Sequence, residues 1–137
     1  MNFPQPPLQS DPIAGALPWV NWFSQVTSYF KAPTTNAPSL ASGWSNVGGA
    51  YQTARYYIDQ SDVVHIEGSI KKSTAGVVGE TIFTLPTGYK PSAQLSFAID
   101  ANGAHGKIDV KANGAVIYQT GTATVSISLS NISFKAA

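Results

Sequence analysis

The chain has 137 residues, about the length of one domain, and 43% of them are hydrophobic while only 11% are charged. Its net charge is +1 and its lysines are scattered, which excludes the basic surface that a nucleic-acid or anionic-membrane partner would need. Cysteine is absent, which excludes disulfides, thiolate metal sites and a cysteine nucleophile.

The N-terminal residues 1–17 are predicted to form an extended, proline-rich arm. The first eleven residues, MNFPQPPLQSD, contain three prolines and show no hydrophobic periodicity. The apolar stretch that follows is broken by Pro18, is too short to span a bilayer and has no basic segment before it. We therefore expect a soluble protein with neither membrane insertion nor a secretory signal.

A stripe of aromatic side chains predicts one short amphipathic helix over residues 18–31. Pro18 suits its first turn, and Pro33 ends it. A helix of this length is not stable alone in water, so we expect it to pack on copies of itself or on a partner protein. The apolar residues of the stripe, spaced as i, i+3, i+4 and i+7, are Trp19, Trp22, Phe23, Val26 and Phe30.

After a linker predicted over residues 32–43, which are rich in proline, serine and threonine, the hydrophobic period changes to two. Asn102-Gly103 and Asn113-Gly114 are strong hairpin signals, because both residue types tolerate positive φ. Residues 44–137 are therefore predicted to be an all-β, antiparallel β-sandwich or jelly-roll-like knob. The expected strands are residues 52–58, 63–71, 80–85, 94–101, 106–112, 116–119, 123–130 and 132–134.

Two places in the knob are expected to bend. Pro86, Gly88 and Pro91 predict a stiff corner between two strands. In TATVSISLS, the residues Ala123, Val125, Ile127 and Leu129 point to one side, whereas Ile132 and Phe134 fall on the opposite parity. A bulge or bend near Asn131 would keep both apolar sets in the core.

No catalytic motif is present, and we expect no enzymatic activity and no cofactor. The chain has only two histidines, lacks a G-x-S-x-G nucleophile motif, and nothing singles out two of its seven carboxylates as a catalytic pair. His65 and Glu67 share one face of a predicted strand, but no third ligand follows from the spacing. They are interpreted as a hydrogen-bonded structural pair rather than a metal site.

Carbohydrate binding is the chemistry that the residues leave open. A sugar site needs an exposed aromatic platform with amide or carboxylate partners, although most tyrosines are expected to pack with only the hydroxyl at the rim. Trp44 is expected to be buried where the linker meets the sandwich. The candidate ligand contacts are Tyr89, Asn102, His105 and Asn113.

Three segments together resemble the C-terminal knob domain of tailed-phage fibre and receptor-binding proteins. They are GWSNVGGAYQTARYYIDQSDVVHIEGSIKK, IFTLPTGYKPS and the closing SLSNISF, in this order from Gly43 onward. The resemblance implies a trimeric β-sandwich knob on a virion, which attaches to a host surface through a glycan or a protein.

The resemblance also implies roles for the N-terminal segments. Residues 1–31 would anchor the chain to a tail or capsid protein, and the aromatic helix would form a homotrimer. Only about 40 residues precede the knob, too few for a long shaft, so a short fibre or spike is expected. Two alternatives remain at this point: a capsid head fibre or decoration protein, and a free-standing lectin-like module.

Overall fold

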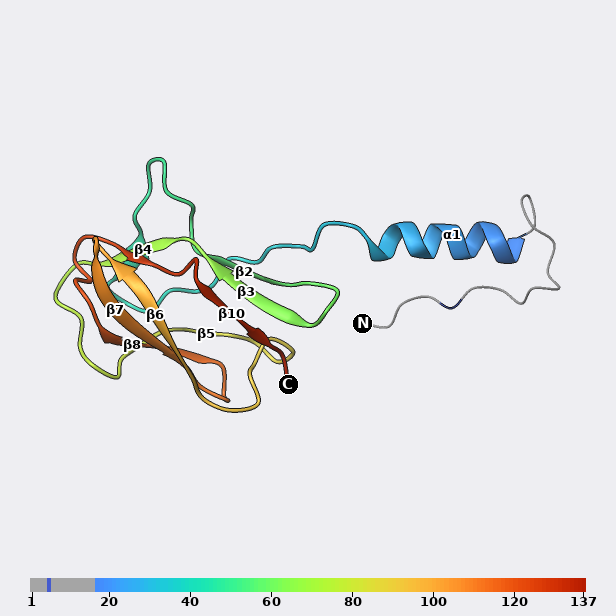
Figure 1. Ribbon diagram of the computed structural model, residues 1–137. Coiled ribbons are helices and arrows are strands. Elements are labelled where there is room, and N and C mark those ends of the chain that lie inside the picture. Colours follow the sequence, from blue (N-terminus) through green and yellow to red (C-terminus); the bar gives the residue numbers. More distant parts are fainter. Residues whose placement is uncertain (1–4, 6–16) are drawn as a thin grey trace. The chain divides into compact units, whose positions relative to one another are not determined.

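The computed structural model describes residue 5 and residues 17–137, which fall into two compact units (Figure 1). A helical unit extends to Pro33, and a β unit extends from Thr34 to Ala137. The proline-rich arm expected over residues 1–17 lies outside the described residues, except for Gln5 and Leu17. Among the described helical residues, no stretch is both long and apolar enough to cross a membrane.

The predicted helix is confirmed as α1, Leu17–Tyr29. It ends four residues before Pro33, in keeping with the bias of pre-proline residues away from helical angles. Along α1, Trp22 lies 5.8 Å from Trp19 and 5.1 Å from Phe23, measured between ring centroids. Trp19, Trp22 and Val26 are half-buried, whereas Phe23 is exposed.

The β unit consists of antiparallel strands, as the sequence predicts. Three sheets have the strand orders β1-β4-β9, β10-β3-β2 and β5-β8-β7-β6. The strands in the described part of the chain are β1 (Trp44–Asn46), β2 (Arg55–Ile58), β3 (Val63–Glu67), β4 (Ser69–Lys72), β5 (Thr81–Thr84), β6 (Leu95–Ala101), β7 (Ala104–Val110), β8 (Ala115–Thr120), β9 (Ile127–Ser128) and β10 (Ile132–Lys135).

Gly68 divides what was expected to be one strand over residues 63–71. Its φ of +116° breaks the strand into β3, which pairs with β2 and β10, and β4, which pairs with β1 and β9. The chain therefore passes from one three-stranded sheet to the other at this glycine. A Cβ atom at position 68 would lie 2.6 Å from the carbonyl oxygen of Thr53, so only glycine fits.

The strand expected over residues 123–130 is mostly a turn. Only Ile127–Ser128 form β9, because the amide of Lys72 bonds to the carbonyl of Ala123 and the chain turns there. The prediction that Val125 points into the core was therefore wrong, since 49% of its surface is exposed. The bend near Asn131 is confirmed: the Ile132 amide donates to the Leu129 carbonyl, and Leu129 and Ile132 are both buried.

The β unit also includes residues 34–43, where the sequence predicted a linker. Asn36 exchanges two backbone hydrogen bonds with Tyr56, of 2.8 and 2.9 Å. The Ala41 amide donates to the Ile82 carbonyl at 2.7 Å. These bonds fix the segment along the sheets up to β1, a strand that the sequence analysis did not predict.

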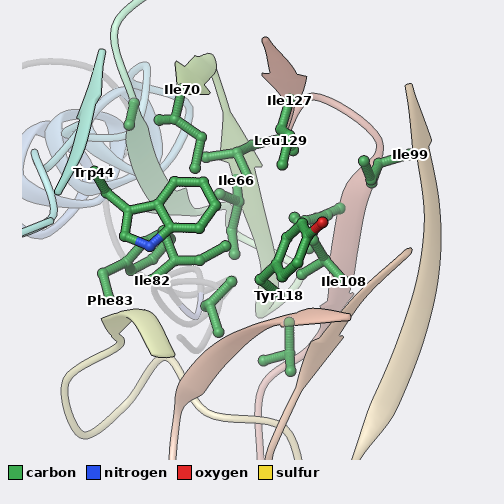
Figure 2. Packing of buried hydrophobic residues seen from close by; sticks show 14 of the residues in the cluster. Trp44, Ile66, Ile70, Ile82, Phe83, Ile99, Ile108, Tyr118, Ile127 and Leu129 are labelled. Carbon is green, nitrogen blue, oxygen red and sulfur yellow. The ribbon is translucent and has the colours of Figure 1, made fainter. Parts of the chain in front are cut away.

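The sheets enclose one hydrophobic core (Figure 2). Trp44 is buried, as expected, with its ring centroid 5.8 Å from that of Tyr118. The burial of β3 alternates strictly, so that Val64 and Ile66 point inward while His65 lies on the outer face. The fully buried side chains with the largest volumes are Phe83, Ile66, Ile70, Ile82, Leu85, Ile108, Ile127, Leu129, Ile132, Val64, Val110 and Val116.

Most loops of the β unit lie at its two opposite ends, whereas the loop between β1 and β2 projects from its side (Figure 1). We call the end that includes Asn36, close to the first residue of the unit, the near end, and the opposite end the far end. The near end holds Asn36, the 59–62 turn, the 86–93 corner, the 111–114 turn and the C-terminus. There the Leu85 amide bonds to Gly114, and the Ala137 amide bonds to Lys90. The far end holds the 73–79 loop, the 102–103 hairpin turn and the 121–126 turn, at the opposite ends of β5, β7 and β8.

Candidate functional site

Two of the four predicted ligand residues, Asn102 and His105, are exposed at the far end. Asn102 and Gly103 form the two-residue turn of the β6–β7 hairpin, with φ of +55° and +79°. The predicted hairpin is thus confirmed, and the Asp100 carboxylate accepts the Gly103 amide at 3.1 Å.

The other two, Tyr89 and Asn113, lie at the near end and have structural contacts. Tyr89 is half-buried with its ring edge-on to Tyr56 at 5.1 Å, and the Asn113 side chain accepts the Ala115 amide at 3.0 Å. The seven residues of β7 separate this pair from Asn102, a distance of roughly 20 Å. The structure therefore does not bring the four residues into one site.

The far end exposes apolar side chains that the sequence analysis did not single out. Val77 is 61% exposed and Val78 is 70% exposed in the 73–79 loop, and Val125 is exposed in the 121–126 turn. No periodic pattern marks these loops, and the alternating sequence around Val125 indicated a strand instead. Contiguous exposed apolar patches mark interaction sites in soluble proteins, whereas single exposed apolar side chains are ordinary.

The far loops are held in place by Tyr118 and Lys72. A Cβ atom at Gly76 would lie 2.5 Å from the Tyr118 ring, so the loop packs closely on it, and the Tyr118 hydroxyl donates to the Gly121 carbonyl. The Lys72 ammonium contacts both oxygens of Glu80 at 2.6 and 2.8 Å. Glu80 also accepts the Val77 amide at 3.1 Å. These contacts fix the positions of the 73–79 loop and the 121–126 turn.

A second surface, which we call the outer-face cluster, lies on the outward side of β2 and β3. It consists of Arg55, Tyr57, Asp59, His65 and Glu67. Arg55 and Glu67 face each other across the strands and form an ion pair of 2.7 Å. The Tyr57 hydroxyl donates to the other oxygen of Glu67 at 3.3 Å.

His65 has a partner different from the one expected. Its Nε2 lies 2.9 Å from the Asp59 carboxylate, whereas Glu67 is bonded to Arg55 and Tyr57, so the predicted His65–Glu67 pair does not form. The Tyr57 ring stacks on the imidazole with centroids 4.9 Å apart and planes 18° apart. Within the described residues, no three histidine or acidic side chains are grouped so that they could hold a metal ion.

The electrostatics of the outer-face cluster follow from these contacts. The hydrogen bond from His65, with two backbone amides at Ser61 and Val63, holds the pKa of Asp59 below its usual value. Burial, together with the negative charge of Glu67, raises the pKa of Tyr57. Burial likewise raises the pKa of Tyr56 on the opposite face, with Tyr89 as a second cause.

The lowered pKa of Asp59 predicts a pH-dependent contribution to stability. Its ionised form stabilises the fold above about pH 4, and this stabilisation is lost as the pH falls through the lowered pKa. Asp59→Asn should therefore reduce the free energy of unfolding at pH 7 by about 1 kcal/mol. This figure is small because the Asp59 and His65 side chains are partly exposed and water weakens their interaction. Urea unfolding at pH 7 and at about pH 2 measures this, and the two proteins should be equally stable at the lower pH.

Asp100→Asn is the matched control, because its side chain accepts one backbone amide that asparagine can accept equally well. It should change stability little at either pH. A constant difference between Asp59→Asn and the natural protein across the pH range would contradict the charge-based explanation.

A third polar cluster surrounds Asp109 on the four-stranded sheet. Its carboxylate is buried and accepts Ser96 at 2.6 Å, Gln119 at 2.9 Å and Gln94 at 3.2 Å. Because these donors satisfy the carboxylate within the sheet, the cluster ties β6, β7 and β8 together. Its geometry fits a structural role.

No protein-family model matches the chain, and no curated protein matches it in sequence. Among solved structures, the chain is similar to the receptor-binding protein of Listeria phage PSA, with a TM-score of 0.65 and 16% sequence identity. The match covers 92% of this chain and 80% of that one. At this identity the likeness shows the fold: an antiparallel all-β unit of the kind found in a phage receptor-binding protein.

Proposed function

We propose that the chain is a structural protein of a phage virion, a short homotrimeric fibre or spike whose β unit attaches to the host surface. The observation that carries the proposal is the fold shared with the receptor-binding protein of Listeria phage PSA over 92% of the chain. The segment resemblance to phage fibre knobs, which rests on different features, supports it.

The two ends of the β unit give the proposal an orientation. Asn36, close to the start of the unit, bonds to Tyr56 and Tyr89 at the near end. Anchoring through residues 1–31 to a tail or capsid protein would therefore leave two surfaces uncovered for contact with the host: the far end, with Val77, Val78 and Val125, and the outward face of β2 and β3. Three linked copies would convert weak single contacts into stable attachment.

The trimer is proposed to form through α1. Phe23 is 51% exposed, and Phe30, directly after the helix, is 68% exposed; they are one heptad apart and so lie on the same side of the chain. Replacing both with glutamate should convert a trimer into a monomer, because two negatively charged side chains from each of the three copies would have to be buried at the contact. Sedimentation equilibrium of the full chain, 14.4 kDa per copy, measures the change.

Asn21→Glu with Gln25→Glu is the matched control for this prediction. Both residues are exposed and lie on the opposite side of α1 from Phe23, so the control adds the same charge without touching the proposed contact. It should remain trimeric. A natural chain that sediments as a monomer at micromolar concentration would count against the trimer.

The function itself is tested on particles and cells. Gold-labelled antibody against the β unit should mark the tail tip of the phage that encodes the chain, and the purified chain should block adsorption of that phage to its host. Label spread over the capsid, with no effect on adsorption, would indicate a head fibre or decoration protein instead. Unlabelled particles would overturn the virion assignment.

A further inference from the structure

We propose that the outer-face cluster binds a neutral sugar of the host surface. The inference rests on the proposed function and names both the ligand class and the residues that recognise it. It also moves ligand recognition away from Asn102, His105, Tyr89 and Asn113, which the structure separates.

The cluster is an ordered surface with hydrogen-bonding groups on two neighbouring strands. Arg55 lies directly opposite Glu67 and Tyr57 directly opposite His65, so the four side chains form two adjacent cross-strand pairs. All are accessible: the side chains of Arg55, Glu67 and His65 are 38%, 29% and 32% exposed. A ligand can therefore reach both pairs at once.

The chemistry of these groups suits hydroxyl groups that both donate and accept. The Arg55 guanidinium carries five N–H donors, only some of which its contact with Glu67 uses, and the carboxylates of Glu67 and Asp59 keep acceptor capacity. Hydrogen bonds from a charged donor or to a charged acceptor are the stronger ones. The stacked Tyr57 and His65 rings add aromatic carbon, which suits the C–H groups of a sugar ring.

The cluster is also rigid before any ligand arrives. Each of its five side chains is bonded to or stacked on another member, with contacts between 2.7 and 3.3 Å for the polar pairs. Less side-chain entropy is therefore lost on binding than at a surface of unpaired long side chains. This is the property that a site for a small, weakly bound ligand requires.

Charge and polarity exclude the other ligand classes. The positive charges of Arg55 and Lys135 on this face balance the two carboxylates of Asp59 and Glu67, so there is no excess of positive charge to bind a phosphate polymer or another polyanion. A protein partner would need an apolar centre in the surface that it contacts. Among the outward-facing residues of β2, β3 and β10, Val63 supplies the aliphatic side chain, and it is half-buried. A neutral, hydroxyl-rich ligand fits best.

The test is an NMR titration of the 15N-labelled full chain with glucose, galactose, mannose, rhamnose, N-acetylglucosamine and N-acetylgalactosamine. We expect at least one sugar to shift amides of residues 55–67, with a Kd of roughly 1 mM for a single site. Glu67→Gln keeps the shape but removes the charge, and Tyr57→Ala removes the ring; each should weaken binding about tenfold. Chemical shifts outside the cluster report whether each variant remains folded.

His105→Ala and Asn102→Ala at the far end are the matched controls, and both should bind the sugar as the natural chain does. Shifts confined to residues 100–106 and lost in the control variants would overturn the assignment to the outer-face cluster. Binding of the natural chain to host cells is measured alongside. If the chain binds cells but none of the six sugars shifts its amides, the ligand class is overturned while the proposed function stands. If the natural chain does not bind host cells at all, both are overturned.

Discussion

Gly68→Ala is expected to destabilise the β unit by about 3 kcal/mol or more, enough to unfold a marginal domain. Two costs add at this position. The backbone φ of +116° is one that side chains with a Cβ rarely adopt, and the new Cβ would lie 2.6 to 2.7 Å from backbone atoms of Thr53 and Ala54. Backbone atoms cannot move aside as a flexible side chain can, so the junction between β3 and β4 would have to shift.

Gly79→Ala separates these two costs. Gly79 also has a positive φ, of +87°, but a Cβ atom there would meet nothing within 4 Å. Its substitution should cost only the backbone strain, about 1 kcal/mol. Urea unfolding of both variants, followed by tryptophan fluorescence, measures the difference. Equal losses at the two positions would show that the clash at Gly68 is relieved.

Trp44→Ala is expected to reduce the free energy of unfolding by about 4 kcal/mol, since it empties a large volume of the core. Trp44 is 6% exposed and packs on Tyr118, at the point where the 34–43 segment joins β1. Lys72 also lies over the indole, with its ammonium 5.9 Å from the ring centroid. The loss should appear as a lower urea midpoint with an unchanged slope.

Trp44→Phe should be much milder, at about 1 kcal/mol. The indole Nε1 is buried, and no hydrogen-bond acceptor for it is found in the part of the chain that the structure describes. Phenylalanine leaves some space unfilled but removes this unsatisfied donor, so the two effects offset each other. Tyr51→Ala, at a 59% exposed site, should change stability by less than about 0.5 kcal/mol. A Phe variant as unstable as the Ala variant would contradict this account.

The parts of the fold that were predicted correctly depend on local chemistry. The Asn102-Gly103 hairpin formed because both residues adopt positive φ without a partner elsewhere, and the 86–91 corner formed a turn with Gly88 at +94°. The single strand expected over residues 63–71, which is β3 and β4 in the structure, shows what local patterns cannot predict. Nothing in the alternating pattern reveals that the chain changes sheets at Gly68, because that depends on Thr53 and Ala54, which lie far from it in sequence.

The sequence placed His65 and Glu67 of the outer-face cluster on one strand face, but it did not predict their partners Arg55, Tyr57 and Asp59, for a reason of register. The turn was expected at residues 59–62, and a symmetric turn there would pair Ile58 with Val63. In the structure Asp62 adopts a positive φ of +61°, the Asp59 amide bonds to the Val63 carbonyl, and Ile58 pairs with Val64 instead. This shift of one residue places Tyr57 opposite His65. A bulge in a four-residue turn thus decides which side chains share a surface.

The bonds of Asn36 and Ala137 have a consequence for folding. Asn36 donates to the Tyr89 hydroxyl at 3.4 Å, and the Ala137 amide donates to the carbonyl of the neighbouring Lys90 at 2.8 Å. Segments that precede and follow the strands therefore both contact the 86–93 corner, and Asn36 lies 53 positions from Tyr89. Contacts so distant in sequence close large loops, which costs chain entropy, so this corner is expected to become ordered late in folding.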